Sequence, residues 1–160
     1  DLNYFNEETK EKYIPHIIET SVGVDRSFFT FLVEAFNEVK GGRTETTESA
    51  KEIEIVLRLN NDLTPVKVAV LPLVKNKQEI TKKAKEIYDI LKTQFVCQYD
   101  ESGSVGRRYR RQDEIGTPYC LTVDFETLEN DDVTIRDRDT MKQERIKIKD
   151  LVVFFKNEVS

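Results

Sequence analysis

Residues 65–74 read PVKVAVLPLV, and almost every side chain in this run is apolar. A strand with one face in water alternates apolar and polar residues, whereas a strand buried on both faces does not. The preceding residues, NNDLTP at 60–65, carry turn signals that end an earlier pattern. The run therefore predicts the central parallel strand of a domain that begins at residue 65.

Helical and strand patterns alternate after this run. A helix is predicted from the cap Asn76, with Glu79 three positions on, and a second from the cap Ser104 to a stop at Gly116. FVCQY at 95–99 and YCLTVDF at 119–125 are β-prone. This β-α-β-α-β order predicts parallel strands with right-handed crossovers. The stripe of the first helix comprises Ile80, Ala84, Ile87, Tyr88, Leu91 and Phe95.

The last part of the chain departs from that alternation. Residues 132–138 and 143–149, DVTIRDR and QERIKIK, both alternate and are four residues apart, which predicts an antiparallel hairpin. A final helix is then predicted from Leu151, Phe154, Phe155 and Val159. For 65–160 we expect an α/β fold: a mixed five-stranded sheet with three helices.

Residues 1–64 predict a strand-helix-strand piece of a separate domain. Pro15 opposes helix, so residues 14–22 are expected to be extended. A helix is expected from Asp25 to the glycines at 41 and 42, followed by a loop at 43–51 and a strand at 53–59.

Composition limits the classes of function. The 160 residues carry a net charge of −5, which argues against non-specific duplex binding but leaves room for RNA recognition by a local patch. Cys97, Cys120 and His16 lie at no metal-ligand spacing, so we expect no metal, two free thiols and a cytoplasmic location. The most apolar run has only nine residues, Val66 to Val74, and predicts no membrane span.

Most catalytic motifs are absent from the sequence. SGSVGRR at 102–108 has neither the Walker lysine nor dinucleotide spacing, and no GxSxG occurs. With no acid–base pair or nucleophile to point to, a small-molecule enzyme is the weakest hypothesis.

Two arginine clusters admit two interpretations each. In GRRYRRQDEIG at 106–116, the arginines can contact RNA, or pair with the acids three positions on, Arg110 with Asp113 and Arg111 with Glu114. In TIRDRDTMKQERIKIK at 134–149, alternation sends Arg136 and Arg138 to one face, where they can bind RNA or merely keep an edge hairpin soluble.

Three segments carry a family resemblance that favours RNA. PVKVAVLPLV, residues 99–129 (YDESGSVGRRYRRQDEIGTPYCLTVDFETLE) and residues 133–148 (VTIRDRDTMKQERIKI) closely resemble the C-terminal anticodon-binding domain of the glycyl-tRNA synthetases, which are class II aminoacyl-tRNA synthetases. IPHIIETSVGVDR at 14–26 resembles motif 3 of their catalytic domain. The resemblance spans residues 13–155, and residues 43–64 depart from it.

The resemblance implies nucleotide and amino-acid contacts in the first third. Gly23, Val24, Asp25 and Arg26 match the ATP-binding run, and Glu19, Thr20, Ser21, Val22 and Gly23 match the glycine-binding run. The whole enzyme would use ATP and Mg²⁺ and form a homodimer. Motifs 1 and 2 have no counterpart here, so we expect this polypeptide alone to bind no cofactor and to form no glycyl-adenylate.

For the larger domain the resemblance implies recognition of the anticodon of a glycine tRNA. Unstacked bases are held by an aromatic ring and by hydrogen bonds to their edges. The matching positions for base contacts are Phe125, Arg136, Arg138, Asp124 and Arg145, and those for tRNA phosphates are Arg107 and Arg111. The alternative is a stand-alone module that binds nucleic acid or protein, against which the intact GVDR at 23–26 argues.

Overall fold

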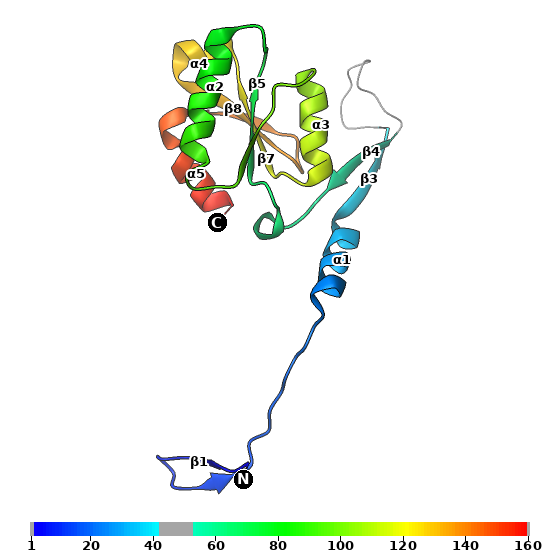
Figure 1. The fold of residues 1–160 in the computed structure, drawn as a ribbon, viewed down its shortest axis with the longest axis vertical. Helices are drawn as coiled ribbons and strands as arrows, with labels where there is room; N and C mark the ends of the chain where they lie inside the picture. The colour runs from blue at the N-terminus through cyan, green and yellow to red at the C-terminus, as the bar shows by residue number, and fades with distance from the viewer. Residues whose placement is uncertain (1, 42–52, 160) are drawn as a thin grey trace. The chain divides into compact units, whose positions relative to one another are not determined.

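The computed structural model describes residues 2–41 and 53–159. The chain divides into two compact units, residues 1–30 and residues 31–160 (Figure 1). The sequence predicts a boundary at 64/65 instead. The predicted loop at 43–51 lies outside the described residues.

The first unit contains one small antiparallel pair, β1 (Tyr4–Phe5) with β2 (Lys12–Tyr13). The Asn6 side chain shapes the turn between them, since its oxygen accepts hydrogen bonds from the backbone N–H groups of Glu8 and Thr9. Residues 14–23 form neither helix nor strand, so the predicted extended stretch is not paired into a sheet.

The helix predicted from Asp25 to Gly41 is shorter in the structure. Helix α1 spans Val24–Ala35, and strand β3 follows at once as Phe36–Lys40. Strand β3 pairs antiparallel with β4 (Ile53–Leu57), so that Phe36 lies opposite Leu57. The prediction of helix was wrong for residues 36–40. Strand β4, in which apolar and polar side chains alternate, forms a ladder of hydrogen bonds with them, and this pairing outweighs the local helical spacing.

The predicted mixed five-stranded sheet is confirmed. Its strands stand in the order β6-β5-β7-β8-β9. Strand β5 pairs parallel with β6 and β7, and the hairpin of β8 and β9 adds antiparallel to β7. The bounds are β5 Val68–Pro72, β6 Cys97–Tyr99, β7 Tyr119–Val123, β8 Asp132–Asp137 and β9 Gln143–Lys147.

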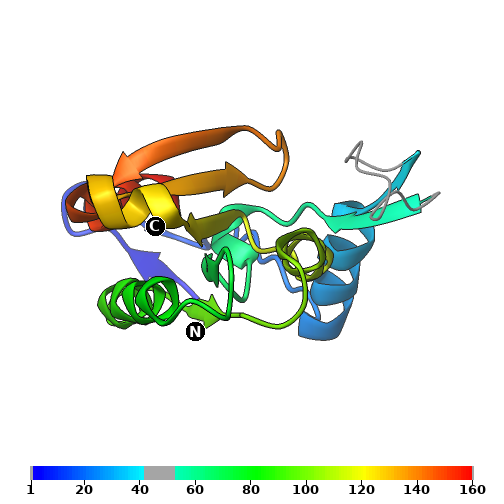
Figure 2. The same cartoon turned by 90° about the horizontal axis from the view of Figure 1, so that it is seen from above.

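Helices cover both faces of this sheet. The three predicted ones are α2 (Gln78–Leu91), α3 (Val105–Ile115) and α5 (Leu151–Glu158). Helices α2 and α5 lie on one face and α3 on the other (Figures 1 and 2). A short helix, α4 (Phe125–Asn130), and two 3-10 turns, η1 (Asn61–Leu63) and η2 (Ile148–Asp150), were not predicted.

The core confirms the interpretation of residues 65–74. All five residues of β5 are buried, as a strand covered on both faces requires. Val68 and Val70 pack under α2, while Ala69 and Leu71 join Cys120 beneath Tyr109 of α3. Both cysteines are free thiols in this structure.

Helix ends follow the sequence signals only in part. Helix α2 starts after Lys77 rather than Asn76, and no side chain caps it, so the predicted cap was wrong. Helix α3 ends at Gly116 in the left-handed conformation, with φ +84°, as predicted. A Cβ at position 116 would lie 3.0 Å from the carbonyl oxygen of Leu57, so glycine also permits β4 to approach.

Two kinds of feature are absent from residues 2–41 and 53–159. No helix in this range has the length and apolarity needed to cross a bilayer. The same range contains no cluster of His, Cys, Asp and Glu that could hold a metal ion.

Candidate nucleic-acid interface

The carboxyl ends of β5, β6 and β7 meet at one edge of the sheet, where α2, α3 and α4 begin. In open α/β sheets ligands bind at this edge, where neighbouring connections run in opposite directions. Here β5 connects towards β6, and β7 connects towards β8. We call the residues at these strand ends the carboxyl edge: Leu73, residues 100–104, Asp124 and Phe125.

Phe125 is the first residue of α4, not the end of a strand as predicted, and is 49% exposed. The turn that holds it is a capping box. Asp124 Oδ1 accepts a hydrogen bond from the backbone N–H of Thr127, at 2.9 Å, while Thr127 Oγ1 accepts one from the backbone N–H of Asp124, at 3.0 Å. Two fixed hydrogen bonds therefore present an exposed aromatic ring at the carboxyl edge.

Arg145 of β9 lies beside this turn. Its guanidinium donates to Asp124 at 2.9 Å and to Asp132 at 2.6 Å, and Glu126 lies 3.1 Å away. Burial raises the pKa of Asp124, but hydrogen bonds from Arg145 and Thr127 outweigh it and hold the pKa below its usual value. The pKa of Asp132 is lowered by Arg145 first and by Lys147 next. The result is a partly exposed cation flanked by ionised carboxylates.

Arg136 occupies a different place from the one predicted. It is 3% exposed, and its guanidinium forms two hydrogen bonds with Asp113 of α3, at 2.9 and 3.0 Å. Its charged group also lies 4.8 Å from the centre of the Tyr109 ring. Alternation predicts that Arg136 and Arg138 share one face of the hairpin, and at Arg136 that face packs against α3. In this structure Arg136 offers no donor to a base.

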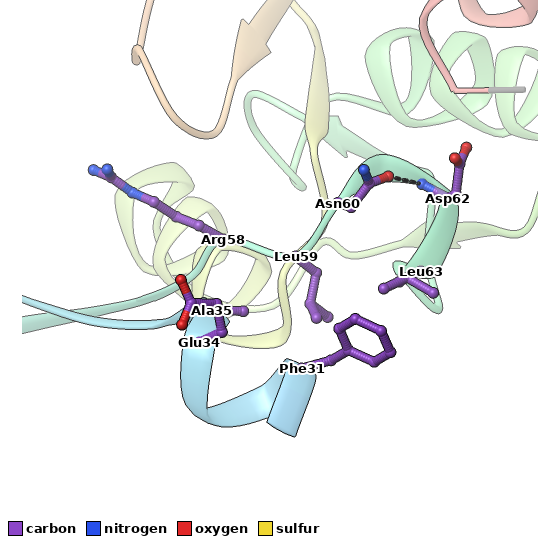
Figure 3. A pocket seen from close by; sticks show the side chains of 8 residues that line it. All are labelled: Phe31, Glu34, Ala35, Arg58, Leu59, Asn60, Asp62 and Leu63. Atoms are coloured by element: carbon purple, nitrogen blue, oxygen red, sulfur yellow. Dashed lines mark hydrogen bonds between the residues drawn. The ribbon is translucent and has the colours of Figure 1, made fainter. Parts of the chain in front are cut away.

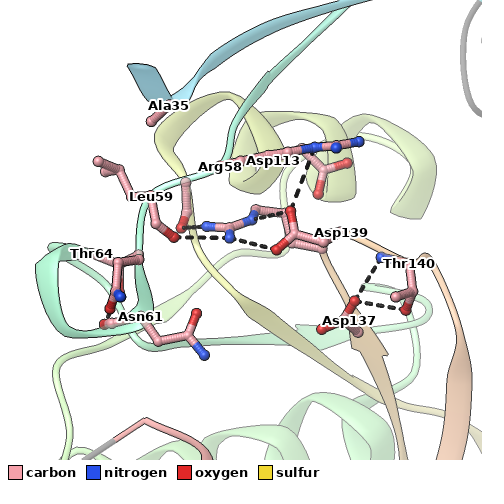
Figure 4. Close-up of polar contacts among 12 residues, drawn as sticks. Ala35, Arg58, Leu59, Asn61, Thr64, Asp113, Asp137, Asp139 and Thr140 are labelled. Carbon is pink, nitrogen blue, oxygen red and sulfur yellow. Dashed lines mark hydrogen bonds and ion pairs between the residues drawn. The ribbon is translucent and has the colours of Figure 1, made fainter. Parts of the chain in front are cut away.

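Arg138 is also buried, at 3% exposure, and lies beyond the end of β8. Nη1 donates to the carbonyl oxygen of Gly116, at 2.7 Å, and Nη2 to that of Leu59, at 2.9 Å. The neighbouring Asp139 takes two further hydrogen bonds (Figure 4). Arg138 therefore joins the end of α3 to the chain after β4 and, like Arg136, serves the fold.

Two arginines of α3 contact acidic side chains outside the helix. Arg110 lies 3.7 Å from Glu54 of β4, and Asp113 pairs with Arg136. Arg111 donates to Asp100 Oδ2, at 2.5 Å, and to the carbonyl oxygen of Ser102. Arg107 is exposed in the first turn of α3.

The residues matched to ATP and glycine lie in the first unit and are all exposed. They form the stretch that leads into α1 and the first three residues of that helix. The Gly23 carbonyl accepts hydrogen bonds from the backbone N–H and the hydroxyl of Ser27, which begins the helix. The set comprises Glu19, Thr20, Ser21, Val22, Gly23, Val24, Asp25 and Arg26.

An open cavity of about 410 Å³ lies elsewhere, between the end of α1 and the chain after β4 (Figure 3). Phe31, Leu59 and Leu63 form its apolar wall, and Glu34 and Arg58 are among its polar lining residues. None of the predicted site residues lines it, so it is not part of the carboxyl edge.

Two features of the edge were missed from the sequence. The first is the capping box, although Asp124 and Thr127 have the spacing that could have revealed it. The second is Arg108, a member of the RRYRR cluster whose side chain is 2% exposed. Nothing in the cluster's spacing separates this buried arginine from its exposed neighbours.

Comparison with known proteins agrees with this geometry. A family model described as an anticodon binding domain matches residues 67–158. The glycine–tRNA ligase of Ruminiclostridium cellulolyticum is 51% identical over 158 residues, which cover 99% of this chain and 32% of that protein. The glycine–tRNA ligase of Malacoplasma penetrans is 53% identical over 150 residues, 94% of this chain and 30% of that protein.

This chain therefore spans about a third of the length of the curated relatives it matches. The family model covers the whole five-stranded sheet and the four helices α2 to α5 packed with it. Because this match takes in more than half of the residues, the chain belongs to the anticodon binding domain family.

Proposed function

We propose that this chain recognises the anticodon of a glycine tRNA and is part of a glycine–tRNA ligase, the enzyme that activates glycine with ATP and transfers it to that tRNA. The observation that carries the proposal is the exposed ring of Phe125 at the carboxyl edge, held by the capping box of Asp124 and Thr127, with Arg145 bound to Asp124. The family match and the ligase relatives support it.

Recognition would use the two kinds of contact that single-stranded RNA offers. An unstacked base lies against Phe125, and stacking of this kind contributes about 1–3 kcal/mol per base. The carboxylates of Asp124 and Asp132 accept hydrogen bonds from base amino or imino groups, and the exposed part of Arg145 donates to base carbonyls or phosphates. Arg136 and Arg138 keep these elements in place from beneath.

The direct test is a pair of fluorescence titrations at one salt concentration. One uses the anticodon stem-loop of a glycine tRNA, and the other a copy with a swapped anticodon. We expect tighter binding of the first. Equal affinity for the two loops, with the protein folded, would contradict anticodon recognition and favour a general interaction module.

Arg107→Ala is expected to flatten the salt dependence of this binding. Its exposed guanidinium in the first turn of α3 suits a phosphate contact, and removing one such cation from a complex with single-stranded RNA lowers the slope of log K against log[salt] by about 0.7. Lys156→Ala, an exposed cation on α5, is the matched control and should leave the slope unchanged. An unchanged slope in the Arg107 variant would remove Arg107 from the interface.

We propose that the first third contributes to the ATP and glycine sites of the larger enzyme. Arg26 suits a nucleotide because its guanidinium stacks on purines and stays charged, and Glu19 suits the ammonium of glycine. Mg²⁺ would neutralise phosphate charge when bound with ATP. Because residues 19–26 are all exposed, they supply contacts but do not enclose a nucleotide.

Accordingly, the 160-residue polypeptide should show no ATP–pyrophosphate exchange with glycine. A site that leaves its ligand in water lacks the positioned, water-excluding groups on which activation depends. Exchange above the no-enzyme background would contradict this. For the larger enzyme we further propose a homodimer in the cytoplasm, where the free thiols Cys97 and Cys120 would stay reduced.

A further inference from the structure

Arg108 is the largest fully buried side chain in the described part of the molecule. It extends from α3 beneath the carboxyl edge. Its Nη1 donates to the carbonyl oxygens of Pro72 and, at 3.4 Å, Asp100, and its Nη2 donates to that of Leu73, at 3.3 Å. Pro72 ends β5 and Asp100 follows β6, so one guanidinium connects the ends of two neighbouring strands.

Burial of the Arg108 guanidinium destabilises the fold, and a packing role alone would not explain why an arginine stands here. The guanidinium nitrogens donate to backbone carbonyls, and Nε has no partner among the described residues. Burial lowers the pKa of Arg108, and the nearby charge of Asp100 offsets this only in part. A buried cation without a hydrogen-bonded carboxylate is destabilising compared with an apolar side chain of similar volume. The carbonyl contacts are what an apolar side chain could not provide.

Those contacts fix a loop that a second arginine fixes from outside. Arg111, one turn along α3, binds the Asp100 carboxylate and the Ser102 carbonyl. Asp100 Oδ1 in turn accepts a hydrogen bond from the backbone N–H of Ser102, at 2.8 Å. Gly103 then adopts φ +76°, which directs the chain into α3. Residues 100–104 are therefore held from beneath and from the side.

A backbone hydrogen bond connects the end of β5 to the end of β7, next to Phe125. The backbone N–H of Leu73 donates to the carbonyl oxygen of Val123, at 2.8 Å, and Val123 precedes the capping residue Asp124. Arg108 thus holds the Leu73 carbonyl while the Leu73 amide holds the end of β7. All three strand ends of the carboxyl edge meet at this group.

We propose that Arg108 is a positioning residue for anticodon recognition, which fixes loop 100–104 relative to Phe125 without touching RNA itself. The inference rests on the proposed function. It predicts that loss of the Arg108 fork reduces discrimination between anticodons, beyond what a loss of stability would cause.

The test compares Arg108→Met, which keeps length and removes the fork, with Arg108→Lys, which keeps a charge and three donors. Leu151→Ala, a core variant at the first residue of α5, is the control for destabilisation. Each is titrated, at a temperature where circular dichroism shows it folded, with the glycine stem-loop and the swapped copy. Amide hydrogen exchange at Leu73 and Ser102 is measured without RNA.

Arg108→Met is expected to lower the ratio of the two affinities by about tenfold, the upper range for one misplaced hydrogen bond. Exchange should rise at Leu73 and Ser102 but not along β8. Arg108→Lys should recover part of both effects, and Leu151→Ala should change neither. If Arg108→Met does not fold, Arg108→Lys carries the comparison, with a smaller loss in the same direction.

Two results would overturn the inference, and they have different consequences for the proposed function. If the wild type discriminates and the Arg108 variants keep the wild-type ratio, Arg108 is merely structural and the proposed function stands. If the wild type itself does not discriminate, the proposed function fails and the positioning role fails with it.

Discussion

Asp113→Asn is expected to lower the free energy of unfolding by about 3–5 kcal/mol, the usual cost of removing one partner from a buried ion pair. Both side chains of the pair are almost fully enclosed, at 4% exposure for Arg136 and 7% for Asp113. The asparagine keeps one acceptor but leaves the Arg136 charge uncompensated between α3 and β8. Urea unfolding followed by circular dichroism measures the change.

The double variant Asp113→Leu/Arg136→Met is the control for this prediction. Replacing both partners by apolar groups removes the unpaired charge, so most of the lost stability should return. The folded fraction of the single variant should bind the stem-loop as the wild type does. A single variant that is stable but loses RNA binding would contradict a purely structural role for this pair and favour the RNA contact that the family resemblance implies for Arg136.

Phe125→Ala is expected to weaken RNA binding and to leave stability almost unchanged, which is the opposite of the result expected for Asp113→Asn. We expect binding of the glycine stem-loop to weaken by about 1–3 kcal/mol, from roughly 5-fold to more than 100-fold, because a stacking surface is removed. The melting temperature should barely change, since about half of the residue is exposed and the capping box of Asp124 and Thr127 remains. Titration and thermal melting of the same samples measure both quantities.

Leu128→Ala is the matched control for the ring. Leu128 lies on the same short helix and is 38% exposed, but it has no flat surface for a base. It should keep wild-type affinity, and Phe125→Trp should keep or improve it. A Phe125→Ala variant that melts early and binds normally would assign the ring to packing and remove the stacking contact from the proposal.

Much of the sheet could be predicted because its signals are local. The nearly continuous apolar run at 66–74 is typical of an enclosed strand, and the alternation at 132–138 and 143–149 indicates a hairpin. Gly116 marks the end of α3 by its left-handed conformation. The helix prediction for residues 36–40 was wrong because the helical spacing that ends at Phe36 competes with pairing to β4, a strand more than ten residues away.

The site was harder to predict because burial of an arginine depends on distant residues. Arg136 and Arg138 resemble surface groups until α3 and the chain after β4 are placed over them, and their partners Asp113 and Leu59 lie 23 and 79 positions away. Arg145 and Phe125 remain accessible, with 30% of the Arg145 side chain and 49% of Phe125 exposed. Alternation gave the face of the strand but not what covers it.

The hydrogen bond from Arg138 to the Leu59 carbonyl oxygen limits how far the chain can be shortened from its N-terminal side without loss of packing. A recombinant product that starts at Pro65 would lose the Leu59 carbonyl and uncover the close approach of β4 to Gly116. The buried guanidinium would then lack one acceptor, and Glu54 would no longer accompany Arg110. The smallest piece expected to keep this packing therefore retains the β3–β4 ribbon, and a recombinant product of that kind should begin upstream of Phe36.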